Sequence, residues 1–261
     1  MRIRATVAAV SGALALSAFV APAAHAAGST PDVTFSNMKI NKGSSMVVGT
    51  TKASFSVTYT VTHAASLPAS DFATGPVIYR GSSVTAPSDL FASDEPGTCT
   101  AASSTVLNCK ATLAFTVGGD ADLVNSEAGS WSVGGVAADA DSNVKWVGGL
   151  GTTKVLRATK LTANATPEPV KKGKTITVTG TLTRANWDTH KYGAYGSQSV
   201  KLQFRKKSST TYTTLKTIKA SSTGALKTTT TASVDGYFRY SFAGTSTSPA
   251  VSATGDYVDV Q

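Results

Sequence analysis

Strict alternation of apolar and polar residues is the feature that most restricts what this chain can fold into. Between residues 54 and 62 every second residue is apolar, and all the others are Ser or Thr. Successive side chains of a β-strand point to opposite faces, so this pattern predicts a strand with one buried face. No long stretch with a helical period of 3.6 lies outside the N-terminal segment, and we expect an all-β fold. The apolar rows are Phe55, Val57, Tyr59 and Val61; Cys109, Ala111, Leu113, Phe115 and Val117; Ile176, Val178, Gly180 and Leu182; Val200, Leu202 and Phe204; and Phe238, Tyr240 and Phe242.

The number of these strands and the turns between them predict antiparallel β-sandwiches. Turn-forming residues occur at 41–43, 118–119, 208–209 and 235–236, between the alternating stretches. A sandwich of this kind takes roughly 100 residues. The 261 residues therefore predict two tandem domains, of residues 27–157 and 158–261.

The two halves of the chain differ in charge. Residues 27–157 contain 8 basic and 10 acidic side chains, whereas residues 158–261 contain 14 basic and 5 acidic ones. A basic half favours an anionic partner. The alternative is that exposed lysines only keep the domain soluble.

Residues 1–26 have the features of a secretory signal peptide. Arg2 and Arg4 precede an apolar run, and Ala24-His25-Ala26 places small residues at both positions that precede cleavage. An N-terminal membrane anchor fits less well, because Ser and Gly interrupt a run that is short for a bilayer span. We expect a secreted, extracellular protein with no membrane span.

The chain has two cysteines, Cys99 and Cys109. In an oxidising compartment the simple expectation is that they pair with each other. A redox-active pair, the alternative, usually has a closer C-x-x-C spacing. The sequence therefore predicts a Cys99–Cys109 disulfide.

The second half contains three stretches with a distinctive pattern, at residues 173–183 (GKTITVTGTLT), 197–205 (SQSVKLQFR) and 235–244 (DGYFRYSFAG). They resemble the Ig-like domains of secreted actinomycete proteins, and residues 129–133 (GSWSV) followed by 138–143 (ADADSN) extend the likeness to the first half. The resemblance implies two tandem Ig-like modules, most of which have no catalysis of their own. The cysteine pair that joins the two sheets of antibody domains is absent.

Motifs for catalysis are sparse. After the leader the sequence contains two histidines, His63 and His190. It contains no Gly-x-Ser-x-Gly elbow, His-Glu-x-x-His pair or phosphate-binding glycine loop. His63 is the last residue of a predicted strand, and Asp71 follows later in the chain. We expect His63 to be exposed to solvent. A hydrolase with a dispersed site stays an alternative, and it needs a polar pocket that joins one histidine to an acid and a nucleophile. We expect no enzyme activity and no cofactor.

Asp139, Asp141 and Asn143 alternate as the first ligands of a calcium loop do. Positions six and twelve of such a loop require Gly and Glu, but Val144 and Leu150 stand there. Asp and Asn also bond their own backbone in tight turns. A turn between strands is therefore the favoured interpretation, and calcium is the weaker one.

Residues 185–197 are rich in aromatic side chains with polar tips. Such side chains can stack on sugar rings while they hydrogen-bond hydroxyl groups. The alternative is that Trp187 or Tyr192 folds back and caps the open end of the sandwich. The candidate ligand-binding residues in this loop are Trp187, His190, Tyr192 and Tyr195.

A basic stripe follows the same loop. Lys201 and Arg205 alternate outward along a predicted strand, and Lys206 and Lys207 occupy the turn after it. Partners of matching charge outside the cell include anionic envelope polymers and acidic polysaccharides. Specific nucleic-acid recognition is not expected, because the chain carries no motif for it.

These features favour a secreted, non-catalytic Ig-like protein that binds an anionic envelope polymer or polysaccharide through residues 158–261. A second hypothesis is a small-ligand-carrying or inhibitory protein, resembling the antibiotic-carrying chromoproteins of the same broad fold; it needs an apolar cleft. The dispersed hydrolase is the third hypothesis.

Overall fold

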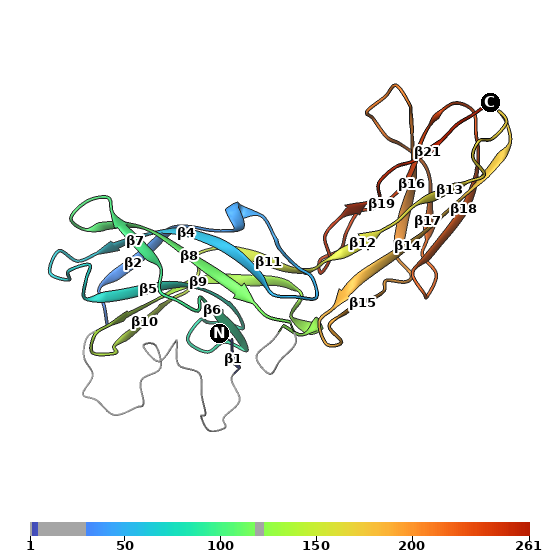
Figure 1. The fold of residues 1–261 in the computed structure, drawn as a ribbon. Helices are drawn as coiled ribbons and strands as arrows, with labels where there is room; N and C mark the ends of the chain where they lie inside the picture. Colours follow the sequence, from blue (N-terminus) through green and yellow to red (C-terminus); the bar gives the residue numbers. More distant parts are fainter. Residues whose placement is uncertain (1, 5–29, 118–122) are drawn as a thin grey trace. The chain divides into compact units, whose positions relative to one another are not determined.

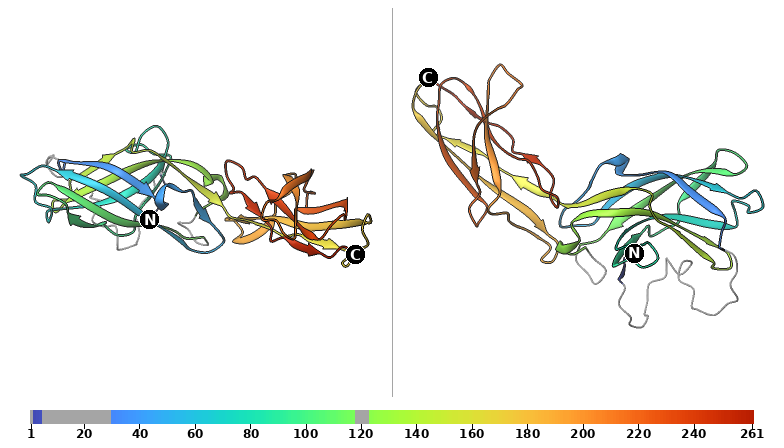
Figure 2. Two further views of the ribbon diagram at one scale, coloured as in Figure 1. Left: turned by 90° about the horizontal axis from the view of Figure 1, so that it is seen from above. Right: turned by 180° about the vertical axis from the view of Figure 1, so that it is seen from behind.

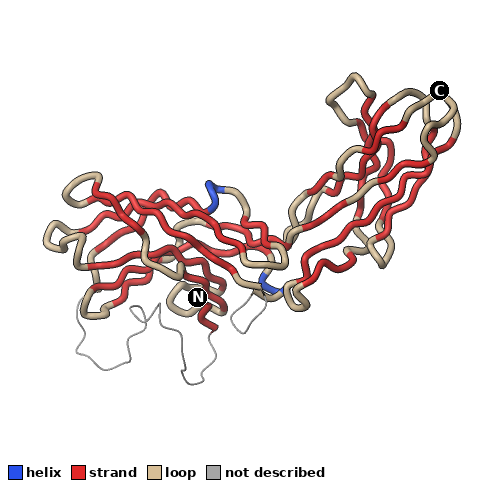
Figure 3. The backbone as a smooth tube through the Cα atoms, viewed as in Figure 1, coloured by secondary structure: helices blue, strands red, loops and turns tan. Residues whose placement is uncertain are grey.

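The computed structural model describes residues 2–4, 30–117 and 123–261, and strands dominate it (Figures 1 and 3). Helical structure in these residues is confined to 3-10 turns at Asn41–Gly43 and Asn125–Glu127. No helix within the described ranges has the length and apolar character needed to cross a bilayer. The all-β prediction is confirmed.

The chain divides into two compact units. The first unit comprises Met1–Met46, Thr51–Leu123 and Gly129–Val155, and the second comprises Val47–Thr50, Val124–Ala128 and Leu156–Gln261. The second unit is therefore built from three separate stretches of the chain. Figure 2 gives two further views of the strands of both units.

The first unit contains two antiparallel sheets. Their strand orders are β1-β6-β5-β9-β11-β3, with β10 paired to β9, and β2-β4-β8-β7. Residues 5–26 of the predicted leader, with its cleavage motif, lie outside the described residues, while residues 2–4 form β1. The strands that lie wholly or partly in this unit are β1 (Arg2–Arg4), β2 (Val33–Ile40), β3 (Met46–Val48), β4 (Ala53–His63), β5 (Phe72–Arg80), β6 (Asp89–Ala92), β7 (Thr98–Ala101), β8 (Val106–Phe115), β9 (Gly129–Asp139), β10 (Val144–Val147) and β11 (Thr152–Arg157).

The core of the first unit lies between the alternating strands. Val57, Tyr59 and Val61 of β4 are buried while their neighbours along the strand are exposed or half-buried, as the sequence pattern predicts. Residue Cys99 of β7 lies directly opposite Cys109 of β8, and the predicted disulfide between them is confirmed. A second apolar cluster covers the other face of β5, which explains why that strand is buried on both sides.

The second unit also contains two sheets, separated by an apolar core. One has the order β12-β14-β13, with β15 and β18 also paired to β14; the other has the order β17-β16-β19-β20, with β21 also paired to β19. The strands are β12 (Thr159–Leu161), β13 (Asn164–Thr166), β14 (Thr175–Asn186), β15 (Lys191–Ala194), β16 (Ser199–Lys206), β17 (Thr213–Lys219), β18 (Ala225–Thr231), β19 (Gly236–Phe242), β20 (Val251–Ser252) and β21 (Asp256–Val258).

Alternation along β16 and β19 divides their side chains between the core and the surface. Leu202 of β16 and Tyr240 of β19 are fully buried and lie opposite each other in the register. The hydroxyl of Tyr240 donates a 2.8 Å hydrogen bond to the carbonyl oxygen of Val178 in β14, which links the two sheets through the core. Every second residue of β16 and β19 consequently faces outward, and these outward residues form the surface described next.

Candidate ligand-binding surface

The outward face of β16, β19 and β21 carries a continuous row of cationic and tyrosine side chains. In the register, Arg205 lies opposite Tyr237, and Tyr237 lies opposite Tyr257. Arg239 lies opposite Gln203, two residues further along both strands. We call this surface the cation–tyrosine face; it consists of Lys201, Gln203, Arg205, Lys207, Tyr212, Tyr237, Arg239 and Tyr257.

Guanidinium groups and tyrosine rings stack on one another along this face. The Cζ atom of Arg205 lies 3.8 Å from the centroid of the Tyr237 ring and 5.4 Å from that of Tyr212. The Cζ atom of Arg239 lies 3.7 Å from the Tyr212 centroid. The rings of Tyr237 and Tyr257 are 5.2 Å apart. Such contacts hold the cations in place by their attraction to the ring quadrupoles.

Hydrogen bonds further restrict the two arginines. The Nη1 group of Arg205 donates to the carbonyl oxygen of Ser209 at 2.8 Å, within the turn that follows β16. The Nε group of Arg239 donates to Oε1 of Gln203 at 2.9 Å. Each guanidinium is therefore held both by a ring and by a neutral acceptor, and its orientation is fixed before any ligand arrives.

One carboxylate lies at the edge of the face. Asp235 is 3.9 Å from Nζ of Lys207, and it accepts hydrogen bonds from the Tyr257 hydroxyl at 3.1 Å and from the Val260 N–H at 2.9 Å. The bond from Val260 is the main cause that lowers the pKa of Asp235. The nearby hydroxyl of Tyr257 is the main cause that raises the pKa of Lys207. This cluster neutralises Lys207 and positions Tyr257.

Arg205 and Arg239 have no carboxylate partner among the residues that the structure describes. Lys201, two strand positions before Gln203, is exposed on the same side of β16. The face thus carries positive charge that the protein itself does not neutralise. An anion is the ligand that this charge distribution favours.

Trp187 and Tyr195, two candidates of the aromatic loop, are buried within the second unit. Trp187 is 1% exposed, and its Nε1 donates to the carbonyl oxygen of Gly49 at 3.0 Å. Tyr195 is 8% exposed and meets the Phe242 ring edge to face. Trp187 is therefore folded back onto the protein, as in the alternative interpretation of this loop. Neither ring is presented for stacking on a sugar.

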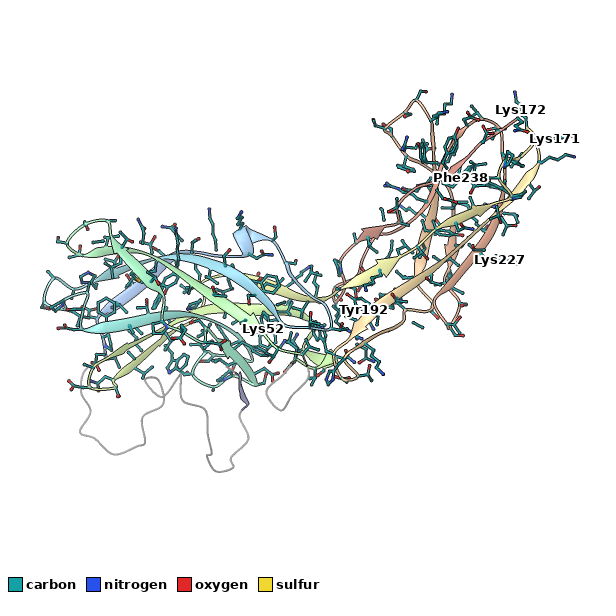
Figure 4. All side chains as sticks on the ribbon, in the orientation of Figure 1. Lys52, Lys171, Lys172, Tyr192, Lys227 and Phe238 are labelled. Atoms are coloured by element: carbon teal, nitrogen blue, oxygen red, sulfur yellow. A yellow bond between two sulfur atoms is a disulfide. The ribbon has the colours of Figure 1, made fainter. Side chains whose placement is uncertain are left out.

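The other two loop candidates lie nearer the surface. Tyr192 is half-buried in β15, and Nζ of Lys160 lies 3.8 Å from the centroid of its ring (Figure 4). Burial raises the pKa of the Tyr192 hydroxyl. His190 is exposed at the turn between β14 and β15, where its φ angle is 56°. A binding role for these two residues stays a prediction, as does one for Lys206, which is exposed.

The candidate calcium residues form a turn between β9 and β10. The carboxylate of Asp139 accepts hydrogen bonds from the backbone N–H of Asn143 at 2.8 Å and from its side-chain amide at 2.9 Å. Asp141 lies in the same turn, beside Ser142 with its φ angle of 65°. These contacts are those of the favoured interpretation, in which Asp and Asn side chains stabilise a tight turn.

The expectation that His63 is solvated is wrong. His63 is 6% exposed, its Nδ1 lies 3.1 Å from the carbonyl oxygen of Ala64, and its ring lies 5.5 Å from that of Phe72. The residue ends the core-facing row of β4, so the alternation that buries Val61 buries it too. Its contacts are those of a core histidine.

Several hollows of the described surface lie on the first unit. One of about 650 Å³ covers the outward side of β4 and β8, and another of about 360 Å³ lies beside β2 and β11. Ser, Thr and charged residues make up most of the lining of the larger one, including Ser54, Ser56, Thr112 and Glu95.

Five members of the cation–tyrosine face were not among the candidate residues singled out from the sequence: Gln203, Tyr212, Tyr237, Arg239 and Tyr257. A signal existed for Tyr237 and Arg239, because they alternate with the apolar row of Phe238, Tyr240 and Phe242 and must therefore face outward. No comparable signal marks Tyr212 or Tyr257. Tyr212 joins the face from the turn between β16 and β17 through its contacts with Arg205 and Arg239, and Tyr257 joins it through the pairing of β21 with β19.

Comparisons with known proteins give similarity at the level of solved structures alone. No protein-family model and no curated protein matches the chain. The chain is similar to the D00-D0 domain of intimin at 13% identity, over 86% of this chain and 99% of that one, with a TM-score of 0.28. It is similar to the Yersinia pseudotuberculosis adhesin InvE at 13% identity, over 89% of this chain and 61% of that one, with a TM-score of 0.28.

A chimeric titin Z1Z2 is similar at 11% identity, over 90% of this chain and 99% of the titin chain, with a TM-score of 0.23. Identities and TM-scores at these levels are too low for an activity or a partner to be transferred. Any function must therefore be argued from the residues of this chain.

Proposed function

We propose that this chain is a secreted, non-catalytic binding protein whose second unit holds an anionic envelope polymer or polysaccharide on the cation–tyrosine face. The proposal combines the export signal expected from residues 1–26 with the charge and geometry of this face. The ligand lies across β16 and β19, and the buried core beneath these strands supports the face.

The observation that carries the proposal is the pair of arginines without carboxylate partners in the described residues. Solubilising charge on a protein surface is usually dispersed, and long side chains there are mobile. Arg205 and Arg239 are instead fixed against Tyr237 and Tyr212 at 3.8 and 3.7 Å. Holding like charges side by side costs free energy, and a polyanion recovers that cost when it binds.

The test is co-sedimentation of the full chain with insoluble polygalacturonate and with bead-coupled poly(glycerol phosphate). Wild-type protein is compared with the double variant Arg205→Gln/Arg239→Gln. The control is Lys171→Gln/Lys227→Gln, which removes the same charge from exposed positions of the same unit. Lys227 projects from β18, in the sheet that does not contain β16 and β19 (Figure 4).

We expect wild type and the lysine control to bind, and the arginine variant to lose most of its binding. Binding by wild type should weaken steeply between about 50 and about 200 mM salt, because counterions released from the polymer drive association. Equal loss in both variants would show that net charge alone acts. Absence of wild-type binding to both polymers at low salt would overturn the proposal.

A further inference from the structure

The tyrosine ring faces of the cation–tyrosine face are already occupied by other groups of the protein. Arg239 covers Tyr212 at 3.7 Å, with Arg205 at 5.4 Å from the same ring. Tyr237 has Arg205 at 3.8 Å and the Tyr257 ring at 5.2 Å. A sugar that binds by stacking needs an open ring face. These rings therefore do not offer the usual platform for a neutral carbohydrate.

The edges of the Arg205 and Arg239 guanidinium groups remain available to a ligand. A guanidinium has five N–H donors in one plane. Arg205 uses Nη1 for Ser209, and Arg239 uses Nε for Gln203, so each retains further donors. Both side chains are half-buried, which leaves part of each one accessible. Planar N–H forks match the two oxygens of a carboxylate or of a phosphodiester.

The two arginines are close enough to act on one stretch of polymer. In the register, Arg205 of β16 pairs with Tyr237 of β19, and Arg239 lies two residues after Tyr237 on β19. Diagonal neighbours of this kind have Cβ atoms roughly 7–8 Å apart. Both guanidiniums also contact the ring of Tyr212, which lies next to each of them. An oxyanion on this face meets two fixed cations.

We propose that the cation–tyrosine face recognises the oxyanion of its ligand, a phosphodiester or carboxylate group, through the N–H forks of Arg205 and Arg239, and that it does not read the sugar ring. This inference rests on the proposed function, since it concerns the same face. It adds that the anionic group is recognised by directed hydrogen bonds in addition to its charge.

The decisive variant is Arg205→Lys/Arg239→Lys, which keeps both positive charges and removes both planar forks. Its affinity is measured by isothermal calorimetry of the full chain with oligogalacturonate and with oligo(glycerol phosphate). Dextran serves as the neutral polymer. Circular dichroism and the thermal midpoint verify that the lysine variant retains the wild-type fold.

We expect the lysine variant to bind both anionic oligomers roughly tenfold or more weakly than wild type, since charge-assisted hydrogen bonds are lost. Wild-type protein should bind both oligomers and should not bind dextran. Inorganic phosphate should displace both oligomers, whereas free galactose should not. Preference for one oligomer would identify the source of the oxyanion, and the proposal would stand.

Equal affinity of the lysine variant and wild type would overturn this inference and leave the proposed function intact, because charge alone would then suffice. Binding of dextran by wild type would also overturn it. Failure of wild type to bind any anionic oligomer would overturn the proposed function itself. The two failures are therefore distinguishable in one set of titrations.

Discussion

Two groups of aromatic residues in the second unit have similar sequences around them but different surroundings in the fold. Residues 185–197 and the cation–tyrosine face both place tyrosines near Lys or Arg. In the first group Trp187 is buried and hydrogen-bonded to Gly49. In the second group the rings are half-buried and the cations upon them reach solvent. Trp187 and Tyr195 of the first group close the core, whereas the rings of the second group cover an outer sheet face.

A cation over a tyrosine ring does not by itself mark a ligand surface. Arg184 lies 4.0 Å from the Tyr195 ring centroid and Lys160 lies 3.8 Å from that of Tyr192, distances like those on the cation–tyrosine face. The difference is how the cations are grouped. Arg184 and Lys160 each lie over a ring of their own, whereas Arg205 and Arg239 both lie over the ring of Tyr212.

The largest effect that would separate the two groups is expected for Trp187→Ala. Loss of a buried Trp side chain destabilises a protein by about 3–5 kcal/mol, because a cavity replaces its contacts. The free energy of unfolding, measured by chemical denaturation, should fall by this amount for the transition that includes the second unit. Polymer binding by the folded protein should be unchanged.

Tyr212→Ala is the matched control for that comparison. It removes a ring from the cation–tyrosine face, where exposed cation–π contacts are worth about 1 kcal/mol. Stability should change little and polymer binding should weaken. A Trp187→Ala protein that is fully stable, or one that is folded but cannot bind, would contradict the division between a structural and a binding group.

An intermediate effect is expected at Tyr240, which occupies the inner side of the strand that carries Tyr237. Burial raises the pKa of the Tyr240 hydroxyl to about 12. Between pH 10 and 12 the unfolded chain ionises this group and the folded chain does not, so stability falls as the pH rises. The loss reaches about 2 kcal/mol above the folded-state pKa. At neutral pH the Tyr240 hydroxyl is uncharged in both the folded and the unfolded state, so its ionisation does not affect stability there.

Tyr240→Phe removes this dependence together with the hydrogen bond to Val178. The variant should be less stable than wild type by about 1 kcal/mol at pH 7. It should lose less stability than wild type as the pH is raised through 12. Thermal unfolding across this range measures both. Parallel curves for the two proteins would show that Tyr240 is ionised as readily in the core as in the unfolded chain.

The smallest effect is expected at Asp235, at the edge of the face. Its pKa is lowered in the folded state, so the stabilisation it gives is present above its ordinary value of 3.8 and is lost as the pH falls through the folded-state pKa. Asp235→Asn should lower the thermal midpoint at pH 7 by less than Tyr240→Phe does. The difference from wild type should disappear in acid. A difference that persists there would exclude the ionised carboxylate as its cause.

Local periodicity was sufficient to predict β4, β8, β14, β16 and β19, one alternating row for each. Val57, Leu113, Val178, Leu202 and Tyr240 are buried as the alternation indicates. Their assignment needs only the two-residue period of a strand, a property of neighbouring residues. The expectation for His63 is wrong because the alternation of β4 continues to the last residue of the strand, which places His63 in the core-facing row.

The candidate site was only partly predictable, because it depends on pairing between distant strands. Lys201 and Arg205 follow from the period of β16, but the rings that hold Arg205 come from the β16–β17 turn and from β19. The burial of Trp187 depends on Gly49, 138 residues earlier in the chain. No local pattern reports such a partner, so exposure could not be read from the aromatic loop itself.

The three-part composition of the second unit has a practical consequence for anyone who engineers it. A gene fragment for residues 158–261 would encode every strand from β12 to β21. It would omit Gly49 and Asn125, whose backbone and side-chain oxygens accept hydrogen bonds from the side chain and backbone of Trp187. A fragment that begins at residue 158 would carry the cation–tyrosine face, but it would lack the residues that accept hydrogen bonds from Trp187. Fusions and domain exchanges should therefore retain residues 47–50 and 124–128.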